Sequence, residues 1–289
     1  MSKVSFIGLG VMGYPMAGHL AASGHQVTVF NRTTSKASRW LEQHVGLLAD
    51  SPRRAAEGAD FVISCVGNDD DLRAVSCADD GAFLGLSAGT VYIDHSTTSA
   101  AVAREISSLA AERGIEFIDA PVSGGQAGAE NAQLTVMCGG SAAGFSAAEP
   151  VIRCYARACA LMGAAGSGQL TKMVNQICVA GVLQGLAEGL HFGEQAGLDM
   201  ASVLEVISKG AAQSWQMENR GATMCEGRYD FGFAVDWMRK DLGIVSEAAR
   251  QLGIELPATN LIDADFEKVQ ALGGNRWDTS SLIEVRRHS

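Results

Sequence analysis

The sequence predicts an α/β domain with a parallel sheet, followed by an all-helical domain that a long helix joins to it. Short β-rich runs alternate with helical patterns over the first ~160 residues, which is typical of βαβ units. The first of these runs ends in a glycine-rich turn at residues 8–13. Strand-like clusters nearly disappear after about Gly166. We therefore expect one domain at residues 1–164 and a second at residues 165–289.

The expected strands of the first domain are short apolar or β-branched runs. They lie at residues 4–8, 25–30, 61–66, 90–94, 116–120 and 134–140. Helical patterns cover residues 12–23 and 99–113. Thr98 or Ser99 is the expected N-cap of the second helix. Residues 168–196 are expected to form one long helix, with apolar residues on most faces, as in a helix buried between domains or subunits.

Composition and charge narrow the classes of protein to which this chain can belong. Its 289 residues carry a formal net charge of −10 and no long Lys/Arg run, so the basic face that nucleic-acid binding needs is missing. Seven dispersed cysteines without a Cys-x-x-Cys pair fit neither a zinc site nor a disulfide framework. The start MSKVSFIG does not have the pattern of a signal peptide, and no apolar run is long enough to span a bilayer. We expect a cytoplasmic protein with free thiols and no metal, nucleic-acid or membrane partner.

The sequence GLGVMG at residues 8–13 follows the first expected strand and opens the first expected helix. In such a turn Gly8 permits the tight bend, Gly10 lets the backbone approach a pyrophosphate, and Gly13 lets helix and strand pack closely. The helix N-terminus adds NH groups and partial positive charge. The turn predicts a Rossmann-type dinucleotide site, although the same glycines also suit a purely structural turn. The expected cofactor contacts are Gly8, Gly10, Val11, Met12 and Gly13.

The residues after the second expected strand bear on the choice between NAD and NADP. NAD-selective sites usually place Asp or Glu here to bind the adenosine ribose. This chain has Asn31, Arg32 and Thr33 instead. An amide, a guanidinium and a hydroxyl suit a 2′-phosphate, and arginine adds bidentate geometry to charge. The sequence therefore predicts NADP(H) in preference to NAD(H); the alternative is that Arg32 is an ordinary surface residue.

The segment DAPVSGG at residues 119–125 follows the fifth expected strand. It lies at the carboxyl end of the sheet, where open α/β folds bind ligands. The two glycines after Ser123 can expose consecutive backbone NH groups as an anion-binding nest. They fit a loop that needs positive φ equally well, so the residues alone leave both interpretations open.

Lys172, Asn175 and Gln176 are spaced so that they share one face of the long helix. A lysine on an otherwise apolar, alanine-rich helix is hard to explain as a solvated residue. Burial favours the neutral form of a lysine, which makes it usable as a general acid or base. The alternative is a lysine near the start of the helix that extends its ammonium group to water.

Four motifs occur in order along nearly the whole chain. They are GLGVMGYPMAGHL at 8–20, DAPVSGG at 119–125, GSGQLTKMVNQ at 166–176 and KDLGIV at 240–245. Together they resemble the β-hydroxyacid dehydrogenase family, which includes 3-hydroxyisobutyrate dehydrogenase, tartronate semialdehyde reductase and the glyoxylate/succinic semialdehyde reductases. The FNRT stretch at the end of the second strand is similar to the NADPH-using semialdehyde reductase branch.

The resemblance implies roles for individual residues. Lys172 would be the catalytic lysine, and Asn175 would hydrogen-bond the substrate. Lys240 and Asp241 would help to close the site over the cofactor. The family often has two asparagines after the lysine; here the second is Gln176, a difference that concerns substrate fit more than chemistry. The other implied contacts are the substrate carboxylate at Ser123, Gly124 and Gly125, the nicotinamide at Thr97, and the adenosine side at Val66 and Asn68.

The implied function is that of an NADP(H)-dependent oxidoreductase with Lys172 as general acid and base. It would interconvert a small β-hydroxyacid or ω-hydroxyacid and its semialdehyde or keto form. Succinic semialdehyde, glyoxylate, methylmalonate semialdehyde, tartronate semialdehyde and 3-hydroxyacids remain open as substrates. One alternative is a non-catalytic NADP-binding protein on the same fold. Two others are enzymes: an imine reductase-like enzyme, which usually lacks the lysine, and a decarboxylating sugar-phosphate dehydrogenase, which would need phosphate-binding basic residues and a longer chain. The apolar long helix favours a homodimer or homotetramer.

Overall fold

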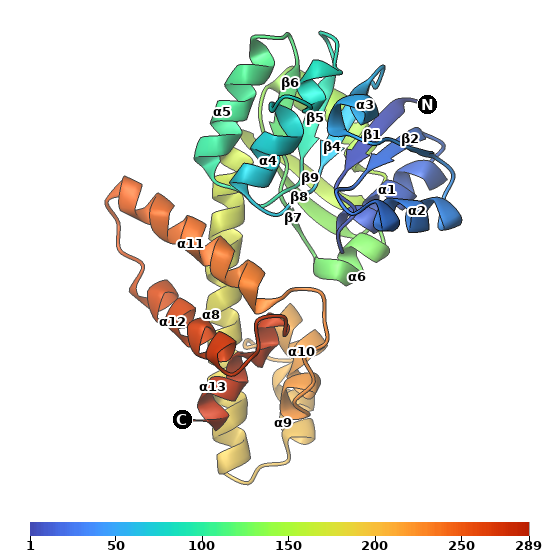
Figure 1. Ribbon diagram of the computed structural model, residues 1–289. Helices are drawn as coiled ribbons and strands as arrows, with labels where there is room; N and C mark the ends of the chain where they lie inside the picture. The colour runs from blue at the N-terminus through green and yellow to red at the C-terminus, as the bar shows by residue number, and fades with distance from the viewer. Residues whose placement is uncertain (289) are drawn as a thin grey trace. The chain divides into compact units, whose positions relative to one another are not determined.

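The structure is a computed structural model that describes residues 1–288 (Figure 1). Its internal contacts divide the chain into two compact units, unit 1 at Met1–Lys172 and unit 2 from Met173 onward. Helix α8 (Ser167–Gln195) begins in unit 1 and continues in unit 2. The expected domain boundary at residues 164–165 lies just before this helix.

Unit 1 is built on one sheet. The nine strands within residues 1–288 are β1 (Lys3–Ile7), β2 (Gln26–Phe30), β3 (Leu47–Leu48), β4 (Phe61–Ser64), β5 (Val91–Asp94), β6 (Glu116–Asp119), β7 (Val122–Ser123), β8 (Leu134–Gly139) and β9 (Ala156–Gly163). They follow the order β3-β2-β1-β4-β5-β6-β8-β7, with β9 paired to β8. Neighbouring strands are parallel from β3 to β6, whereas β8 runs antiparallel to β6 and β7.

Helices cover both faces of this sheet. Besides the start of α8, they are α1 (Gly13–Ala22), α2 (Thr34–Gln43), α3 (Pro52–Ala56), α4 (Asp69–Ser76), the short 3-10 helix η1 (Ala82–Leu84), α5 (Ala100–Ala111), α6 (Gly125–Glu130) and α7 (Ala142–Ile152). Tyr92 of β5 packs in one cluster with Leu72 of α4 and Ile106 of α5. Its neighbour Ile93 packs in another cluster with Met16 of α1. The central strands are therefore apolar on both faces, as expected of a parallel sheet between two helical layers.

The direction of the crossovers changes at β1. From β1 the chain passes through α1 to β2 and on to β3, and it then returns through α3 to β4 on the other side of β1. Ligands of open α/β sheets bind at the carboxyl ends of the strands at such a switch point. The glycine-rich turn lies at this point because it directly follows β1.

Unit 2 is helical. It contains most of α8, then α9 (Met200–Ile207), α10 (Trp215–Cys225), α11 (Val235–Leu252), α12 (Pro257–Ala271), the 3-10 helix η2 (Thr279–Leu282) and α13 (Ile283–Arg287). Leu183 and Leu190 of α8 share a buried cluster with Met238 of α11 and Phe266 of α12. None of the helices within residues 1–288 is both long and apolar enough to cross a membrane. The predicted fold class, a Rossmann-type parallel sheet followed by an all-helical part, is confirmed.

The elements expected in unit 1 do not include β3, β7, β9, α2, α3, α6 or α7. Strand β9 has the sequence ARACALMG, which lacks β-branched residues and is largely exposed. It pairs in parallel with β8 along most of its length. The pairing with β8 explains this strand better than its own β-propensity does.

Candidate active site

The three glycines of the turn after β1 have different surroundings. Gly8 has a φ of +100°, and a Cβ there would lie 2.3 Å from the carbonyl oxygen of Cys65. A Cβ at Gly13 would lie 2.0 Å from the carbonyl oxygen of Gly8, so the packing of α1 against the turn requires glycine. A Cβ at Gly10 would meet no atom within 4 Å. The backbone at Gly10 therefore borders open space at the N-terminus of α1, where a phosphate can approach.

Asn31 holds this turn against the end of β2. Its Oδ1 accepts a hydrogen bond from the NH of Leu9 at 2.8 Å, and its Nδ2 donates to the carbonyl of Thr33 at 2.9 Å. Later in the turn, the side chain of Val11 is exposed, and Met12 is the N-cap residue of α1. The amide of Asn31 thus fixes the backbone of the turn at which the sequence predicts a bound cofactor.

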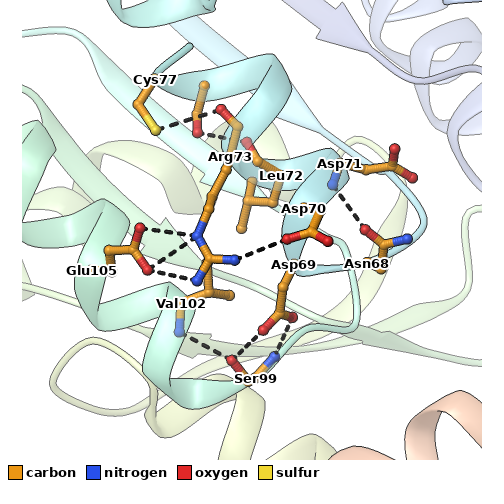
Figure 2. Close-up of polar contacts among 11 residues, drawn as sticks. Asn68, Asp69, Asp70, Asp71, Leu72, Arg73, Cys77, Ser99, Val102 and Glu105 are labelled. Carbon is orange, nitrogen blue, oxygen red and sulfur yellow. Dashed lines mark hydrogen bonds and ion pairs between the residues drawn. The ribbon is translucent and has the colours of Figure 1, made fainter.

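Arg32 lies at the surface, and it pairs with a residue in the first turn of α4. Its side chain is 87% exposed, and its Nη1 lies 3.1 Å from Oδ1 of Asp71. Asn68 caps α4, because its Oδ1 accepts from the NH of Asp71 at 2.8 Å (Figure 2). An exposed ion pair of this kind contributes little to stability. Because the side chain of Arg32 is so exposed, its guanidinium is accessible to a second anion. No carboxylate occupies positions 31–33, just after β2.

A buried polar network centred on Asp94 joins the carboxyl ends of β4 and β5. Its Oδ1 accepts from the hydroxyl of Ser64 at 2.7 Å and from that of Ser96 at 2.6 Å. The hydroxyl oxygen of Ser96 also accepts from the NH of Val66 at 2.8 Å. Burial raises the pKa of Asp94 to about 7, although the hydrogen bonds from the serines act in the opposite direction. The network links Val66 to the loop that contains Thr97.

His95 connects the same loop to two further buried groups. Its Nδ1 lies 2.6 Å from the carbonyl oxygen of Ala120, and its Nε2 lies 2.8 Å from the hydroxyl of Tyr155. A carbonyl can only accept, so Nδ1 carries the proton and Nε2 accepts from the tyrosine. Burial lowers the pKa of His95 to about 4, so the imidazole is neutral at neutral pH. This histidine is a hydrogen-bonding link and not a cation.

The loop at residues 123–125 has backbone geometry that favours glycine. Gly124 and Gly125 have φ values of +129° and +62°. Strand β7 ends at Ser123, and α6 begins at Gly125. A Cβ at Gly125 would meet no atom within 4 Å, so the backbone here also borders open space. The requirement for positive φ is therefore real, and it is compatible with an anion-binding nest.

Lys172 is buried in the first part of α8. The residue is only 7% exposed, and its Nζ donates a hydrogen bond to the carbonyl of Val122 at 2.8 Å. Val122 immediately precedes Ser123, so the ammonium group lies beside the backbone of the 123–125 loop. The interpretation in which this lysine extends to water is wrong.

Asp119 anchors the start of α8 to the end of β6. Its Oδ1 accepts from the NH of Gly166 at 2.7 Å, and its Oδ2 accepts from the NH of Gln169 at 2.9 Å. Burial raises the pKa of Asp119, while the hydrogen bonds from these NH groups act to lower it. The carboxylate satisfies backbone donors that a helix N-terminus otherwise leaves without partners.

Sequence reasoning included Asp119 in the DAPVSGG motif without giving it a role, and it did not single out Asp94. Both close a short buried strand, in the sequences VYID and EFID. A carboxylate at the end of an otherwise apolar strand is the signal that could have found them, because buried charges need hydrogen-bond partners.

In unit 2 a chain of polar contacts links Asn175 to Lys240. Nδ2 of Asn175 donates to Oε1 of Gln176 at 2.8 Å, and Nε2 of Gln176 donates to Oδ2 of Asp241 at 2.6 Å. Nζ of Lys240 lies 3.0 Å from Oδ1 of Asp241. Gln176 and Asp241 are both buried. Gln176, where the chain departs from the expected pair of asparagines, therefore stands at the centre of this network and orients Asn175.

The other reactive side chains are dispersed. Within residues 1–288, no three His, Cys, Asp or Glu side chains are grouped so that they could hold a metal ion. Within the described residues no cysteine forms a disulfide. Burial raises the pKa of Cys138 to about 12, which keeps this thiol protonated and a poor nucleophile.

Comparison with known proteins identifies the family. A family model described as the NAD binding domain of 6-phosphogluconate dehydrogenase matches residues 3–163. A second, described as the NAD-binding of NADP-dependent 3-hydroxyisobutyrate dehydrogenase, matches residues 166–286. A Shewanella frigidimarina protein that carries the name "Uncharacterized oxidoreductase" is 62% identical over 98% of this chain and 97% of its own length. The chain belongs to the β-hydroxyacid dehydrogenase family.

Other members of the β-hydroxyacid dehydrogenase family are similar over the same length. The 2-hydroxy-3-oxopropionate reductase of Escherichia coli is 31% identical over 98% of this chain and 96% of its own length. Among solved structures, 3-hydroxyisobutyrate dehydrogenase of Mycobacterium tuberculosis with L-serine matches with a TM-score of 0.89 and 31% identity, over 99% of both chains. This chain is thus an oxidoreductase of the β-hydroxyacid dehydrogenase family that acts on CH–OH groups and has NAD(P)-binding domains.

Proposed function

We propose that this oxidoreductase interconverts a small β-hydroxyacid or ω-hydroxyacid and its semialdehyde or keto form, with NADP(H) as the preferred cofactor. The observation that carries the proposal is the position of the Lys172 ammonium group, which is buried and donates to Val122 beside the 123–125 loop. A buried amine is costly unless it is paired or used. A donor held next to an open stretch of backbone suits proton delivery to a bound carbonyl compound.

The turn after β1 suits the pyrophosphate of a dinucleotide, because its backbone borders open space at Gly10 beside the N-terminus of α1. NADPH bound there would supply a hydride to the carbonyl carbon. Arg32 would bind the 2′-phosphate with its exposed guanidinium, supported by Asn31 and Thr33. The match to a family model described for an NADP-dependent enzyme supports this choice of cofactor. The other proposed cofactor contacts are Gly8, Val11, Met12, Gly13, Val66, Asn68, Thr97 and Lys240.

In the reducing direction Lys172 donates a proton to the substrate oxygen as that oxygen becomes an alkoxide, and in the oxidising direction it takes the proton back. The hydrogen bond to the carbonyl of Val122 orients this ammonium group beside the 123–125 loop. The 123–125 loop would bind the substrate carboxylate through a hydroxyl and backbone NH groups, and Asn175 would hydrogen-bond the substrate. Fixing the carboxylate sets the distance between the reacting carbonyl and the lysine.

The names of the relatives favour a particular spacing within the substrate. The E. coli relative is named for 2-hydroxy-3-oxopropionate, and the M. tuberculosis relative is named for 3-hydroxyisobutyrate and was solved with L-serine. In each of these compounds the reacting or equivalent oxygen is on the carbon β to the carboxylate. We therefore rank tartronate semialdehyde and methylmalonate semialdehyde above succinic semialdehyde and glyoxylate.

The test is turnover of the purified protein with NADPH and NADH against these four aldehydes. Lys172→Ala should lower kcat by roughly 100- to 10 000-fold, the range expected for the loss of a general acid, while NADPH affinity measured by fluorescence stays near that of the wild type. Lys209→Ala, which removes an exposed lysine paired with Glu205, is the matched control. Turnover retained by Lys172→Ala would remove this lysine from the mechanism. NADPH binding without turnover on any aldehyde would favour a non-catalytic NADP-binding protein.

We also propose that the protein is a homodimer or homotetramer in which unit 2 takes part. Val174, Val182 and Phe192 of α8 are exposed. Large apolar side chains that are exposed on one helix favour association. Light scattering in solution would contradict the proposal if it gave the mass of a single chain, 30.2 kDa.

A further inference from the structure

Gln169 is fully buried in the first turn of α8, and its side chain binds the loop after β5 twice. Its Oε1 accepts from the NH of Thr98 at 3.1 Å, and its Nε2 donates to the carbonyl of Ser96 at 2.8 Å. These two backbone groups flank Thr97. A backbone NH and a backbone carbonyl together need one acceptor and one donor, which a side-chain amide supplies in a single orientation.

The backbone of Gln169 is itself fixed. Its NH donates to Oδ2 of Asp119, and the NH of Gly166 donates to Oδ1 of the same carboxylate. Asp119 ends β6 in the middle of the sheet. The amide therefore projects from a helix turn that the sheet holds in place.

The loop around Thr97 is held from its other sides as well. The hydroxyl of Ser96 donates to the buried carboxylate of Asp94. The NH of Ser99 donates to Oδ1 of Asp69 at 2.9 Å, and its hydroxyl donates to Oδ2 at 2.5 Å (Figure 2). The residues on both sides of Thr97 are thus tied to β5, α4 and α8. These ties set the position of the backbone at residue 97.

Lys172 lies three residues after Gln169 on α8, at a spacing that places both on neighbouring turns of one helix face. Its Nζ is held by the carbonyl of Val122. The same few residues of α8 therefore carry the amide that binds the loop of Thr97 and the amine beside the 123–125 loop. A shift of this turn would move both together.

We propose that Gln169 is a positioning residue, whose amide fixes the backbone at Thr97 relative to the turn of α8 that carries Lys172. The inference rests on the proposed function, in which Thr97 lies beside the nicotinamide and Lys172 transfers the proton. Without the amide, the NH of Thr98 and the carbonyl of Ser96 would be buried without these partners. The loop would then find other positions, and hydride and proton donors would be less well aligned.

The first test compares Gln169→Met with Gln184→Met. Gln184 is also a buried amide of α8, and it donates to Glu188 and Asp265 in unit 2, away from the proposed site residues. Gln169→Met should lower kcat by roughly 10- to 100-fold, the loss expected from misplacement of about 1 Å, with a smaller change in KM for NADPH. The primary isotope effect with deuterated NADPH should rise, because hydride transfer becomes slower than the other steps. Gln184→Met should keep the kcat and the isotope effect of the wild type.

A folded Gln169→Met protein with the kcat and isotope effect of the wild type would overturn the proposal and leave the function of Lys172 standing. Should Gln169→Met not fold, Gln169→Glu keeps the shape and the acceptor for Thr98 but loses the donor for Ser96 when ionised, and the same loss of kcat is expected.

Hydrogen–deuterium exchange of the peptide containing residues 95–99 gives a readout independent of turnover. Exchange there should become faster in the Gln169 variant and not in Gln184→Met. Unchanged exchange would overturn the positioning role even if no aldehyde proved to be a substrate.

Discussion

The hydroxyl of Ser96 donates to the carboxyl group of Asp94 across 2.6 Å, and both groups are buried. Because burial raises the pKa of Asp94 to about 7, the folded chain binds this proton more tightly than the unfolded chain does. The contribution of this proton to stability is therefore fully present below the unfolded pKa of about 4, and it is lost as the pH rises through about 7.

Asp94→Asn should make stability less dependent on pH across this range. Asparagine keeps an oxygen for the two serines and stays neutral at every pH. The free energy of unfolding of the wild type, minus that of the variant, should therefore decrease as the pH rises from about 4 to about 8. Urea denaturation at intervals of one pH unit measures this difference. Parallel profiles for the two proteins would show that Asp94 does not titrate in this range.

Arg32→Asp should shift the preference from NADPH towards NADH. The variant loses a charge-assisted bond to the 2′-phosphate and gains a carboxylate that suits the ribose hydroxyl, so KM for NADPH should rise roughly 10- to 100-fold. Asp71→Asn is the control, because it removes the ion pair with Arg32 and keeps the guanidinium. That control should retain the preference for NADPH. Unchanged selectivity in Arg32→Asp would refute the assignment of the phosphate to this arginine.

Gly10→Ala should lower NADPH affinity without destabilising the protein, whereas Gly13→Ala should destabilise it. A methyl group at Gly10 meets no protein atom, so the melting temperature should hardly change, while NADPH affinity should fall because the methyl lies where the pyrophosphate approaches. A methyl group at Gly13 would lie 2.0 Å from the carbonyl oxygen of Gly8, so this variant should be destabilised. Thermal melting and NADPH titration of both variants separate the two effects. Full NADPH affinity in Gly10→Ala would place the cofactor elsewhere.

Ser99→Ala should lower the stability of the protein and raise its KM for NADPH. The hydroxyl oxygen of Ser99 caps α5 by accepting from the NH of Val102 at 3.1 Å, and its loss should cost about 1 kcal/mol (Figure 2). Ser141→Ala removes the cap of α7, which accepts from the NH of Gly144 at 2.8 Å, and should cost a similar amount. Only Ser99→Ala should also raise KM for NADPH, because Ser99 belongs to the loop of Thr97. Equal KM values in the two variants would contradict the link between this loop and the cofactor.

Much of the fold follows from local patterns. The long helix is expected at residues 168–196 and observed at Ser167–Gln195, since this stretch has no proline and no strand-like cluster to interrupt it. Strands β1, β2, β4, β5 and β6 of the parallel sheet lie within one or two residues of their expected ends, because a buried apolar run bounded by turns has few alternative structures. Strands β3, β7 and β9 are not among the expected strands, and the pairing of β9 with β8, more than its composition, accounts for that strand.

The site could be predicted only in part. The glycine turn and Lys172 stand out locally, because a motif and an isolated charge are visible in a short window of sequence. Asp119 and Gln169 lie in the quoted motifs, but their roles could not be predicted, because what each residue does depends on distant residues. Asp119 accepts from backbone groups 47 and 50 residues later in the chain, and the amide of Gln169 binds groups 71 and 73 residues earlier. Such contacts exist only once the sheet and α8 have come together.

The carboxylate of Asp119 has a practical consequence for anyone who wishes to produce the cofactor-binding half as a separate protein. The match to the NAD-binding family model stops at residue 163, before both of the NH groups that Asp119 binds. A fragment cut at that point would retain a buried carboxylate and lose those donors, which is a strongly unfavourable arrangement. A stable fragment would need to extend through the opening turn of α8.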